Sequence, residues 1–308
     1  MAAVTAALVK QLRDQTGAGM MDCKTALTES AGDFEAAVDW LRKKGLAAAA
    51  KKAGRVASQG LVGLEVAGQR GALVEVNSET DFVARNQDFQ ALVRMAARLA
   101  LEVGGDLERL KAASVPASGR TVADEIIQAI AVIGENINLR RAAAVEVAEG
   151  AIGAYVHAAL APGLGTIGVL VGLQSAGDPE RLAALGKQLA MHVAAARPQA
   201  VTVERLEARA LERERAIYAE QARASGKPDA IVDKIVEGRV RKFYEEAVLL
   251  EQAFVIDPDL KVKDAIDRVA EDIGSSIVVT EFVRFALGEG LSGPSSNLAE
   301  EVAQLAGT

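Results

Sequence analysis

The chain has 308 residues, of which 50% are apolar and 25% are charged, and its 35 basic and 42 acidic side chains give a net charge of −7. The length exceeds the usual size of one domain, and the composition excludes a disordered chain. The acidic balance argues against broad binding of nucleic-acid phosphates, because proteins that do this usually present a basic surface.

The charge is uneven along the chain. Residues 1–56 carry a net charge of +3, which leaves −10 on the remainder. A solvated helical face accounts for the basic segment, and docking onto an acidic partner is the alternative.

Cysteine and histidine usage and the lack of long apolar segments indicate the compartment. Cys23 is the single cysteine, so we expect no internal disulfide, and the two histidines beside it predict no zinc cluster. The first residues are typical of an amphipathic helix rather than a signal or transit sequence, and no apolar run approaches the roughly 20 residues of a membrane helix. We therefore expect a cytoplasmic protein with no membrane contact, cofactor or metal ion.

Residues 4–56 predict a small helical domain of three or four short helices. Apolar side chains recur at helical spacing over residues 4–12, 20–27 and 33–41. An Ala- and Lys-rich stretch at residues 46–55 predicts a further helix that leads into the next unit.

From Gly60 the apolar period changes to two, which is typical of strands. Leu61–Val66 and Ala72–Val76 predict a β-hairpin around a turn at residues 68–71. Helices are then expected at residues 82–101, 121–133 and 178–196, and strands at residues 142–147, 153–159 and 166–173. A sheet backed by helices, and hence an α+β fold, follows from this order.

Two charge-rich helices are expected at residues 203–224 and 229–247. A short link, Ser225–Pro228, joins them, and apolar side chains recur along both. An antiparallel helical hairpin that projects from the body is the simplest structure, and a brace for the sheet is the alternative role. The remaining expected elements are a helix at 262–271, a strand at 276–285 and a short helix at 297–305.

The run Glu75–Arg85 delivers an apolar strand through a Thr-Asp-Phe-Val turn into a helix. Thr80 or Asp81 can accept backbone N–H bonds as a helix N-cap, which would fix the direction of Phe82. Phe82 either packs into the core of its own domain, as Phe usually does, or forms a wedge aimed at a partner. The residues alone leave both interpretations open.

Motifs for catalysis are not convincing in this sequence. Residues 163–168 satisfy the GxGxxG pattern, but a predicted strand follows them where a nucleotide-binding loop needs a helix. His157 and His192 have no matching acid and nucleophile, so each is interpreted as a structural histidine rather than a catalytic base. The residues therefore favour a binding protein without an active site.

Four motifs, in order along the chain, resemble those of the bacterial elongation factor Ts family. They are Leu12–Leu27, Glu75–Arg85, Ile133–Arg141 and Phe282–Gly290, and they extend over nearly the whole sequence. The resemblance implies a guanine nucleotide exchange factor for elongation factor Tu in translation, with no covalent chemistry of its own. A scaffold that binds a partner without affecting nucleotide release is the competing hypothesis.

The resemblance also implies a division of the chain. An N-terminal helical domain of the ubiquitin-associated type occupies residues 1–56, and an antiparallel coiled-coil hairpin associated with homodimer formation is inserted at 201–247. The remainder is a core of two subdomains with antiparallel sheets, at 57–143 and at 144–200 with a return at 248–263, followed at 264–308 by a C-terminal module that docks on the partner.

Particular residues acquire roles by the same resemblance. The intruding element is Thr80–Val83, in which Asp81 and Phe82 disturb the magnesium and phosphate region of elongation factor Tu. Thr80 and Val83 flank this pair.

Five further residues are implied to contact the partner: Arg13, Met20, Met21, His157 and His192. The first three match a motif that touches the nucleotide domain, and the two histidines match positions that face the third domain of elongation factor Tu. For the two methionines, packing within their own helical domain is the alternative. The loop Ala158–Gly165 is longer than expected for the family, and no direct contact with nucleic acid is implied.

Overall fold

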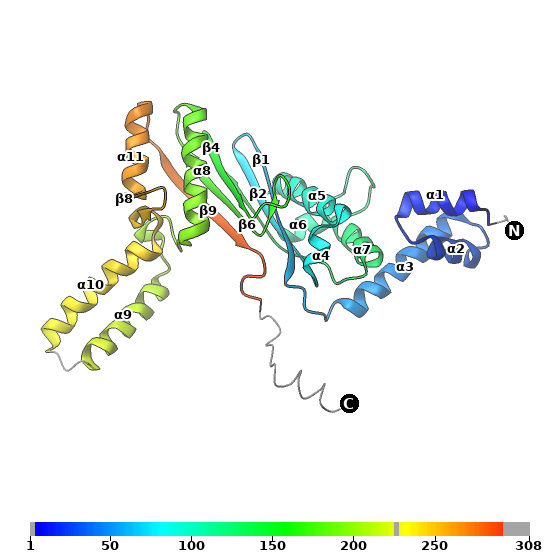
Figure 1. The fold of residues 1–308 in the computed structure, drawn as a ribbon, viewed down its shortest axis with the longest axis horizontal. Helices are drawn as coiled ribbons and strands as arrows, with labels where there is room; N and C mark the ends of the chain where they lie inside the picture. Colours follow the sequence, from blue (N-terminus) through cyan, green and yellow to red (C-terminus); the bar gives the residue numbers. More distant parts are fainter. Residues whose placement is uncertain (1–3, 225–227, 292–308) are drawn as a thin grey trace.

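A computed structural model describes residues 4–224 and 228–291 of the chain. Its parts are a small helical domain, a body in which helices cover antiparallel sheets, and a pair of long helices that projects from the body (Figure 1). This mixture of helices and antiparallel sheets agrees with the expected α+β class. The short helix expected at residues 297–305 lies outside the described residues.

The N-terminal domain packs three helices around a small apolar core. The helices are α1 (Ala6–Thr16), α2 (Met20–Glu29) and α3 (Phe34–Lys52). Leu12, Cys23 and Leu27 are fully buried between them. Burial also raises the pKa of the Cys23 thiol, so this cysteine is a core residue rather than a reactive one.

Helix α3 differs from the expectation, because residues 34–52 form one continuous helix rather than two. The intervening Arg, Lys and Leu residues are good helix formers, and only Gly45 weakens the run. A Cβ atom at Gly45 would lie 3.5 Å from Ile127 of α7 (Val122–Ile133), so α3 crosses that helix at close range. Helix α3 therefore joins the small domain to the body.

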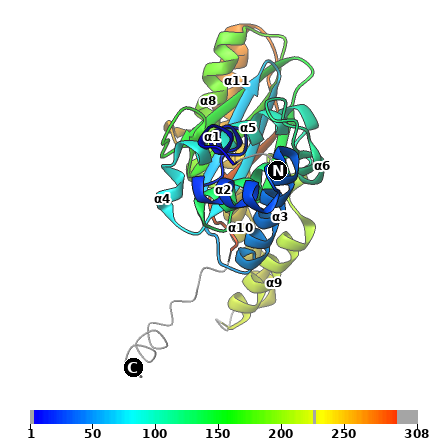
Figure 2. The ribbon, with the colours of Figure 1, turned by 90° about the vertical axis from the view of Figure 1, so that its right-hand side faces the viewer.

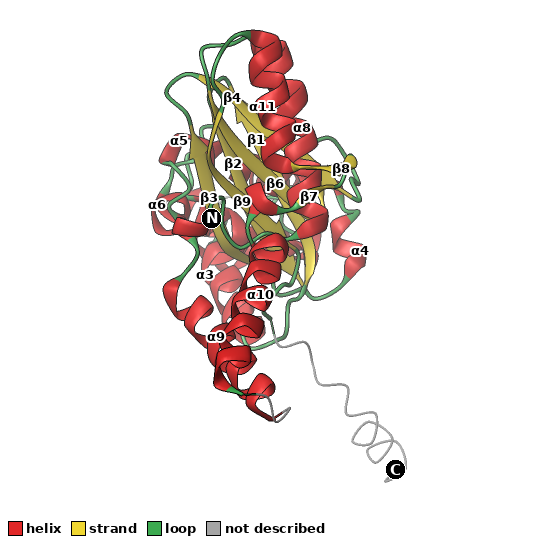
Figure 3. Cartoon of the chain, turned by 90° about the vertical axis from the view of Figure 1, so that its left-hand side faces the viewer, coloured by secondary structure: helices red, strands yellow, loops and turns green. Residues whose placement is uncertain are grey.

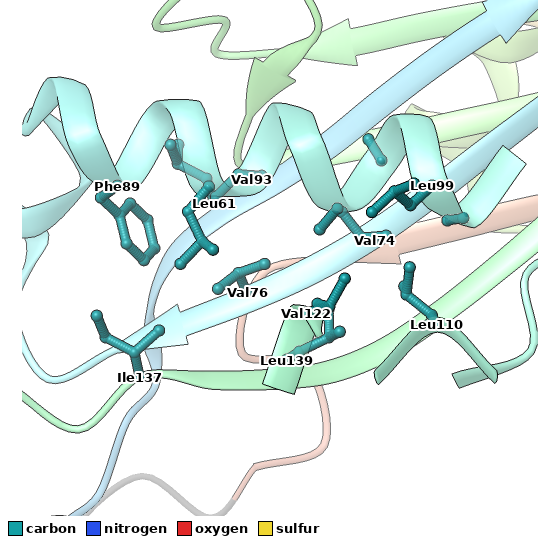
Figure 4. Packing of buried hydrophobic residues seen from close by; sticks show 14 of the residues in the cluster. Leu61, Val74, Val76, Phe89, Val93, Leu99, Leu110, Val122, Ile137 and Leu139 are labelled. Carbon is teal, nitrogen blue, oxygen red and sulfur yellow. The ribbon is translucent and has the colours of Figure 1, made fainter. Parts of the chain in front are cut away.

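The first sheet has the strand order β3–β2–β1–β5, with antiparallel pairs throughout. Its strands are β1 (Gln59–Ala67), β2 (Arg70–Ser78), β3 (Asn138–Glu146) and β5 (Leu164–Gly165). Strands β1 and β2 form the expected hairpin. Helix α5 (Gln87–Val103) lies on this sheet, with Phe89 beside Leu61 in the shared core (Figure 4).

The helix expected at residues 82–101 is divided into α4 (Asp81–Ala84) and α5. Asn86 causes the division, because its Oδ1 accepts hydrogen bonds from the amides of Asp88 (2.8 Å) and Phe89 (3.1 Å) and caps α5. Helix α4 is thus one turn long and separate from the helix that covers the sheet. A further short helix, α6 (Leu107–Ala112), was not expected.

The second sheet has the order β4–β6–β9, again antiparallel. Its strands are β4 (Gly150–His157), β6 (Ile167–Gln174) and β9 (Val278–Ala286). Helices α8 (Pro179–Ala196) and α11 (Val262–Ile273) lie beside it, with a small ribbon of β7 (Ala253–Phe254) and β8 (Asp257–Lys261). The three expected strands and both helices are confirmed.

Strand β9 lies in the expected C-terminal module, whose boundary at residue 264 stays a prediction. It pairs with β6 from Val278 to Ala286, and Val279 and Phe285 are buried. Residues 264–286 therefore belong structurally to the second sheet and its cover, since hydrogen bonds and core packing both hold them there. The sheets also share a core in which Leu73 of β2 meets Leu170 of β6.

The projecting pair consists of α9 (Ala208–Ala224) and α10 (Asp229–Ala247), which pack along each other (Figures 1 and 3). Helix α9 begins later than expected because Leu206 is extended and buries its side chain in a cluster with Phe243. Coiled-coil packing and dimer formation through this hairpin stay predictions. Neither these helices nor any other in the described ranges is long and apolar enough to cross a membrane.

Two glycines inside helices provide a test of how closely α8 packs on β4. A Cβ atom at Gly186 of α8 would lie 2.7 Å from the Cα of Gly153 in β4, whereas one at Gly238 of α10 would meet nothing within 4 Å. Gly186→Ala should lower the free energy of unfolding by about 1–3 kcal/mol, because α8 must move off the strand. Gly238→Ala should raise it by up to about 1 kcal/mol through helix propensity. Urea unfolding of both variants checks this pair, and shifts of the same sign and size would contradict it.

Candidate functional site

Phe82 is the most informative side chain of the site, because 77% of its surface is exposed. Its neighbours Val83 and Ala84 are buried in the core of the first sheet. The interpretation that Phe82 packs into its own core is therefore wrong. Figure 2 shows α4, which carries Phe82, at the outer edge of the body.

Thr80 is the N-cap residue of α4, but its side chain does not make the capping bond that the sequence suggested. Neither Thr80 nor Asp81 accepts a capping hydrogen bond from the backbone of α4. Thr80 instead donates from its amide to Oε2 of Glu135 (3.0 Å) and from Oγ1 to Oε1 of Glu135 (2.6 Å). The Ser78 hydroxyl also donates to the Thr80 carbonyl (2.9 Å). Contacts from outside α4 therefore fix the residue that precedes it.

The far end of α4 is held as firmly. The Arg85 amide donates to the Phe82 carbonyl (3.1 Å), and the Asn86 amide donates to the Val83 carbonyl (2.9 Å). Gln90 of α5 donates from its side-chain amide to the Ala84 carbonyl (3.0 Å). The backbone of Phe82 is thus set between two anchored ends, while its ring stands in solvent.

Glu79 connects the same region to the linker that follows α3. Its Oε1 accepts from the Asn136 amide (2.6 Å) and pairs with Arg55 at 3.4 Å. The side-chain amide of Asn136 donates in turn to the Arg55 carbonyl (2.8 Å). Three segments distant in sequence therefore meet beside α4.

Glu75 of β2, four residues before Glu79, has a completely buried side chain. Both of its carboxylate oxygens accept from Arg140, at 3.0 and 3.1 Å, and Oε2 also accepts from Arg141 at 2.5 Å. Asn77 and the Gly288 amide donate to Oε1 at 3.0 and 2.9 Å. Burial acts to raise the pKa of Glu75, but the bonds from Gly288, Asn77 and Arg141 outweigh it and hold the pKa below its ordinary value of 4.5.

The two arginines extend this network to the end of β9. Arg140 donates to the Glu289 carbonyl (2.6 Å), and Arg141 donates to the Ala286 carbonyl (2.9 Å). The Arg141 guanidinium also lies 4.2 Å from the ring centre of Phe285. Residues from three of the four sequence motifs therefore form one cluster of charges around Glu75.

Arg13, Met20 and Met21 lie on the N-terminal domain, and all three are exposed. Met20 is 51% exposed and Met21 is 69% exposed, so packing inside their own domain does not account for them. Both line a hollow of about 410 Å³. Its other lining residues are Val4, Thr5, Ala6, Val9 and Lys24.

The two histidines have opposite environments. His157 ends β4 and is exposed, with Nδ1 3.1 Å from the Tyr155 hydroxyl. His192 of α8 is fully buried, so a direct contact with a partner is incompatible with this conformation. Its Nε2 donates to Gln252 (2.8 Å) and its Nδ1 accepts from the Val255 amide (3.2 Å). Burial, only partly offset by the Gln252 bond, lowers the pKa of His192, which keeps the ring neutral.

The expected partner-contacting residues are distributed over the molecule rather than gathered in one cleft. Figure 1 shows α2, which carries the two methionines, at the right-hand end and α8, which carries His192, on the far side of the sheets from it. The glycine pattern at 163–168 leads into strand β6, as the sequence analysis expected. Within the described ranges, no group of three or more His, Cys, Asp or Glu side chains is arranged to hold a metal ion.

Glu135 is the residue of this site that the sequence analysis missed. The motif Ile133–Arg141 contains it, but nothing in a linear pattern shows that its carboxylate reaches Thr80, 55 residues earlier. The available signal was an acidic residue directly after a Gly that ends a helix. That Gly134 has a φ of 88°, a left-handed conformation that turns the chain toward β3.

Comparison with known proteins agrees with the motif analysis over the whole chain. A family model described as "Elongation factor TS" matches residues 79–289. The chain is 60% identical over 304 residues to "Elongation factor Ts" of Rhodospirillum rubrum, with 98% of both chains covered. It is 57% identical to the proteins of the same name from Rhodospirillum centenum, over 307 residues, and Gluconobacter oxydans, over 308 residues, with 100% of both chains covered in each case.

The opposite environments of Phe82 and Val83 predict opposite effects on stability. Phe82→Ala should leave the melting temperature nearly unchanged, because the ring is 77% exposed. Val83→Ala should lower the free energy of unfolding by about 1–3 kcal/mol, because it removes buried methyl groups. Calorimetry of the two variants makes the comparison. A large loss of stability in Phe82→Ala would show that the ring packs in the protein after all.

The depressed pKa of Glu75 predicts an acid-dependent loss of stability. The carboxylate contributes its full stabilisation above its ordinary pKa of 4.5, and this contribution is lost as the pH falls from there toward the lower folded pKa. Glu75→Gln should lower the free energy of unfolding by about 1–3 kcal/mol at pH 7, because charged hydrogen bonds are lost. Below pH 4.5, the free energy of unfolding of the variant should fall less steeply with pH than that of the wild type. Urea unfolding from pH 7 to pH 3 tests this, and parallel curves for the two proteins would contradict it.

Proposed function

This chain belongs to the elongation factor Ts family, a family of translation elongation factors, and we propose that it binds elongation factor Tu carrying GDP and promotes GDP release so that GTP can bind. The observation that carries the proposal is the exposed ring of Phe82 on a backbone that is held at both ends. An aromatic side chain presented in this way serves no purpose in the core of the protein. It suits insertion into a partner.

Nucleotide exchange requires no bond to form or break. It requires a coupling free energy between two ligands of the same protein, so if the exchange factor weakens GDP binding, GDP must weaken binding of the exchange factor equally. Each tenfold acceleration of release corresponds to about 1.4 kcal/mol of preferential stabilisation of the open partner. No cofactor or covalent step enters this mechanism.

Phe82 supplies part of this energy. Burial of one aromatic ring in a partner groove is worth roughly 1.5–3 kcal/mol, and it is available only in the partner conformation that has the groove. The exposed carboxylate of Asp81 enters beside the ring and disturbs the magnesium and phosphate region. Thr80 and Val83 anchor the pair, one through Glu135 and the other through the core.

Other surfaces of the chain provide the remaining binding energy. Arg13, Met20 and Met21 present a basic and two flexible apolar side chains for the nucleotide domain of the partner. His157, exposed at the end of β4, is proposed to face the third domain. His192 is proposed to contribute indirectly, because its Nδ1 accepts from the Val255 amide and so holds the turn between β7 and β8. Action in the cytoplasm follows from this role in translation.

Release of a fluorescent GDP from elongation factor Tu, chased with unlabelled nucleotide, tests the function. A trace of this chain should accelerate release catalytically, and Phe82→Ala should slow that accelerated release by roughly tenfold to a hundredfold. Val66→Ala is the matched control. It removes an exposed apolar side chain at the opposite end of the β1–β2 hairpin and should leave release unchanged.

The outcomes separate the two hypotheses for the chain. Complex formation without any acceleration of release would establish a scaffold and reject exchange. If the wild-type chain accelerates GDP release and Phe82→Ala accelerates it equally, the exchange function stands and the wedge role of Phe82 is rejected.

A further inference from the structure

Glu135 holds Thr80, the N-cap residue of α4, with both oxygens of its carboxylate. One oxygen accepts the Thr80 amide and the other accepts the Thr80 hydroxyl, at 3.0 and 2.6 Å. The two bonds together use both donors of Thr80, and bidentate bonds to an ionised group are both stronger and more directional than single neutral ones. Rotation of Thr80 is therefore restricted by a residue from another part of the chain.

Helix α4 cannot fix its own orientation. It has four residues, and no side chain caps its N-terminus from within. An isolated turn of helix is unstable, since nucleation costs more than one hydrogen bond returns. The direction of α4, and with it that of Phe82, depends on contacts that other segments make.

The segment that carries Glu135 is well placed for this task. Gly134 ends α7 in a left-handed conformation, and Ile137 is buried immediately before β3. Between them, Asn136 donates its amide to Glu79. Glu79, which follows β2, therefore binds this segment without help from Glu135. Loss of Glu135 should loosen Thr80 and α4 without unfolding the sheet.

We propose that Glu135 is a positioning residue for exchange, which holds Thr80 and thereby presents Phe82 to elongation factor Tu in a binding-competent orientation. This inference rests on the proposed exchange function and deepens it. A ring that is ordered before binding loses less conformational entropy on insertion than a mobile one. Glu135 acts through Phe82 and need not touch the partner.

A double-mutant cycle in the GDP-release assay tests the proposal. Glu135→Ala should slow accelerated release by roughly tenfold, which corresponds to about 1.4 kcal/mol. In a chain that already carries Phe82→Ala, the same substitution should slow release by clearly less than tenfold, because the ring is gone and only Asp81 of α4 is left to be positioned. Full additivity of the two losses would overturn the proposal, since a general structural role predicts independent effects.

Two control variants separate the specific contact from the loss of a carboxylate in general. Glu135→Gln keeps an acceptor for Thr80 with neutral bonds, and it should reduce release by no more than about threefold. Glu125 of α7 also accepts with both oxygens, from Arg120 at 3.1 Å each, but makes no contact with α4. Glu125→Ala should leave release unchanged. A loss equal to that of Glu135→Ala would reject the specific role.

Hydrogen exchange gives a readout that needs no partner. The Thr80 amide, followed by NMR in the full chain, should exchange at least about tenfold faster in Glu135→Ala than in the wild type, because its acceptor is removed. Unchanged hydrogen exchange of the Thr80 amide would overturn the proposal that Glu135 holds Thr80, whatever the GDP-release assay shows. If the wild-type chain fails to accelerate GDP release while Thr80 responds, the exchange function fails, and with it the role of Glu135 in exchange.

Discussion

The buried carboxylate of Glu75 is the interaction on which the arrangement of the body depends. A carboxylate with no exposed surface is tolerated only when charged and polar donors satisfy it, and Arg140, Arg141, Asn77 and the Gly288 amide do so. These donors come from β2, β3 and the segment after β9. The requirement to satisfy one charge therefore fixes how the first sheet meets the end of the second.

Polar contacts of a similar kind hold the backbone around α4, where the apolar side chain of Phe82 is exposed to solvent. Exposure of Phe82 forgoes the stabilisation that its burial would bring, and a mobile exposed ring would also lose entropy on binding. Glu79, Glu135 and the cap at Asn86 hold the backbone on either side. Under the proposed exchange function, these polar contacts orient one exposed aromatic side chain for binding to the partner.

Local patterns in the sequence predicted most elements, and the misses share a cause. The β1–β2 hairpin, the strands of the second sheet and the paired helices α9 and α10 follow from apolar periodicity and turn residues. The errors lie where a side chain chooses between local and distant partners. Asn86 caps α5 and divides one expected helix, Thr80 bonds to Glu135 rather than to its own helix, and Gly45 continues α3 because α7 lies against it.

The sequence by itself determined the α+β class and the family, because these are encoded in spacing and in contiguous motifs. The role of the Thr-Asp-Phe-Val run stays a prediction. Only the tertiary structure decided which side chains face solvent. It placed Phe82, Met20 and Met21 outside and His192 inside, although each was open to either interpretation. It also joined β9 to the second sheet and Glu135 to Thr80. Burial and long-range hydrogen bonds depend on how segments far apart in the sequence pack together. A local sequence pattern does not show which of these segments meet in space.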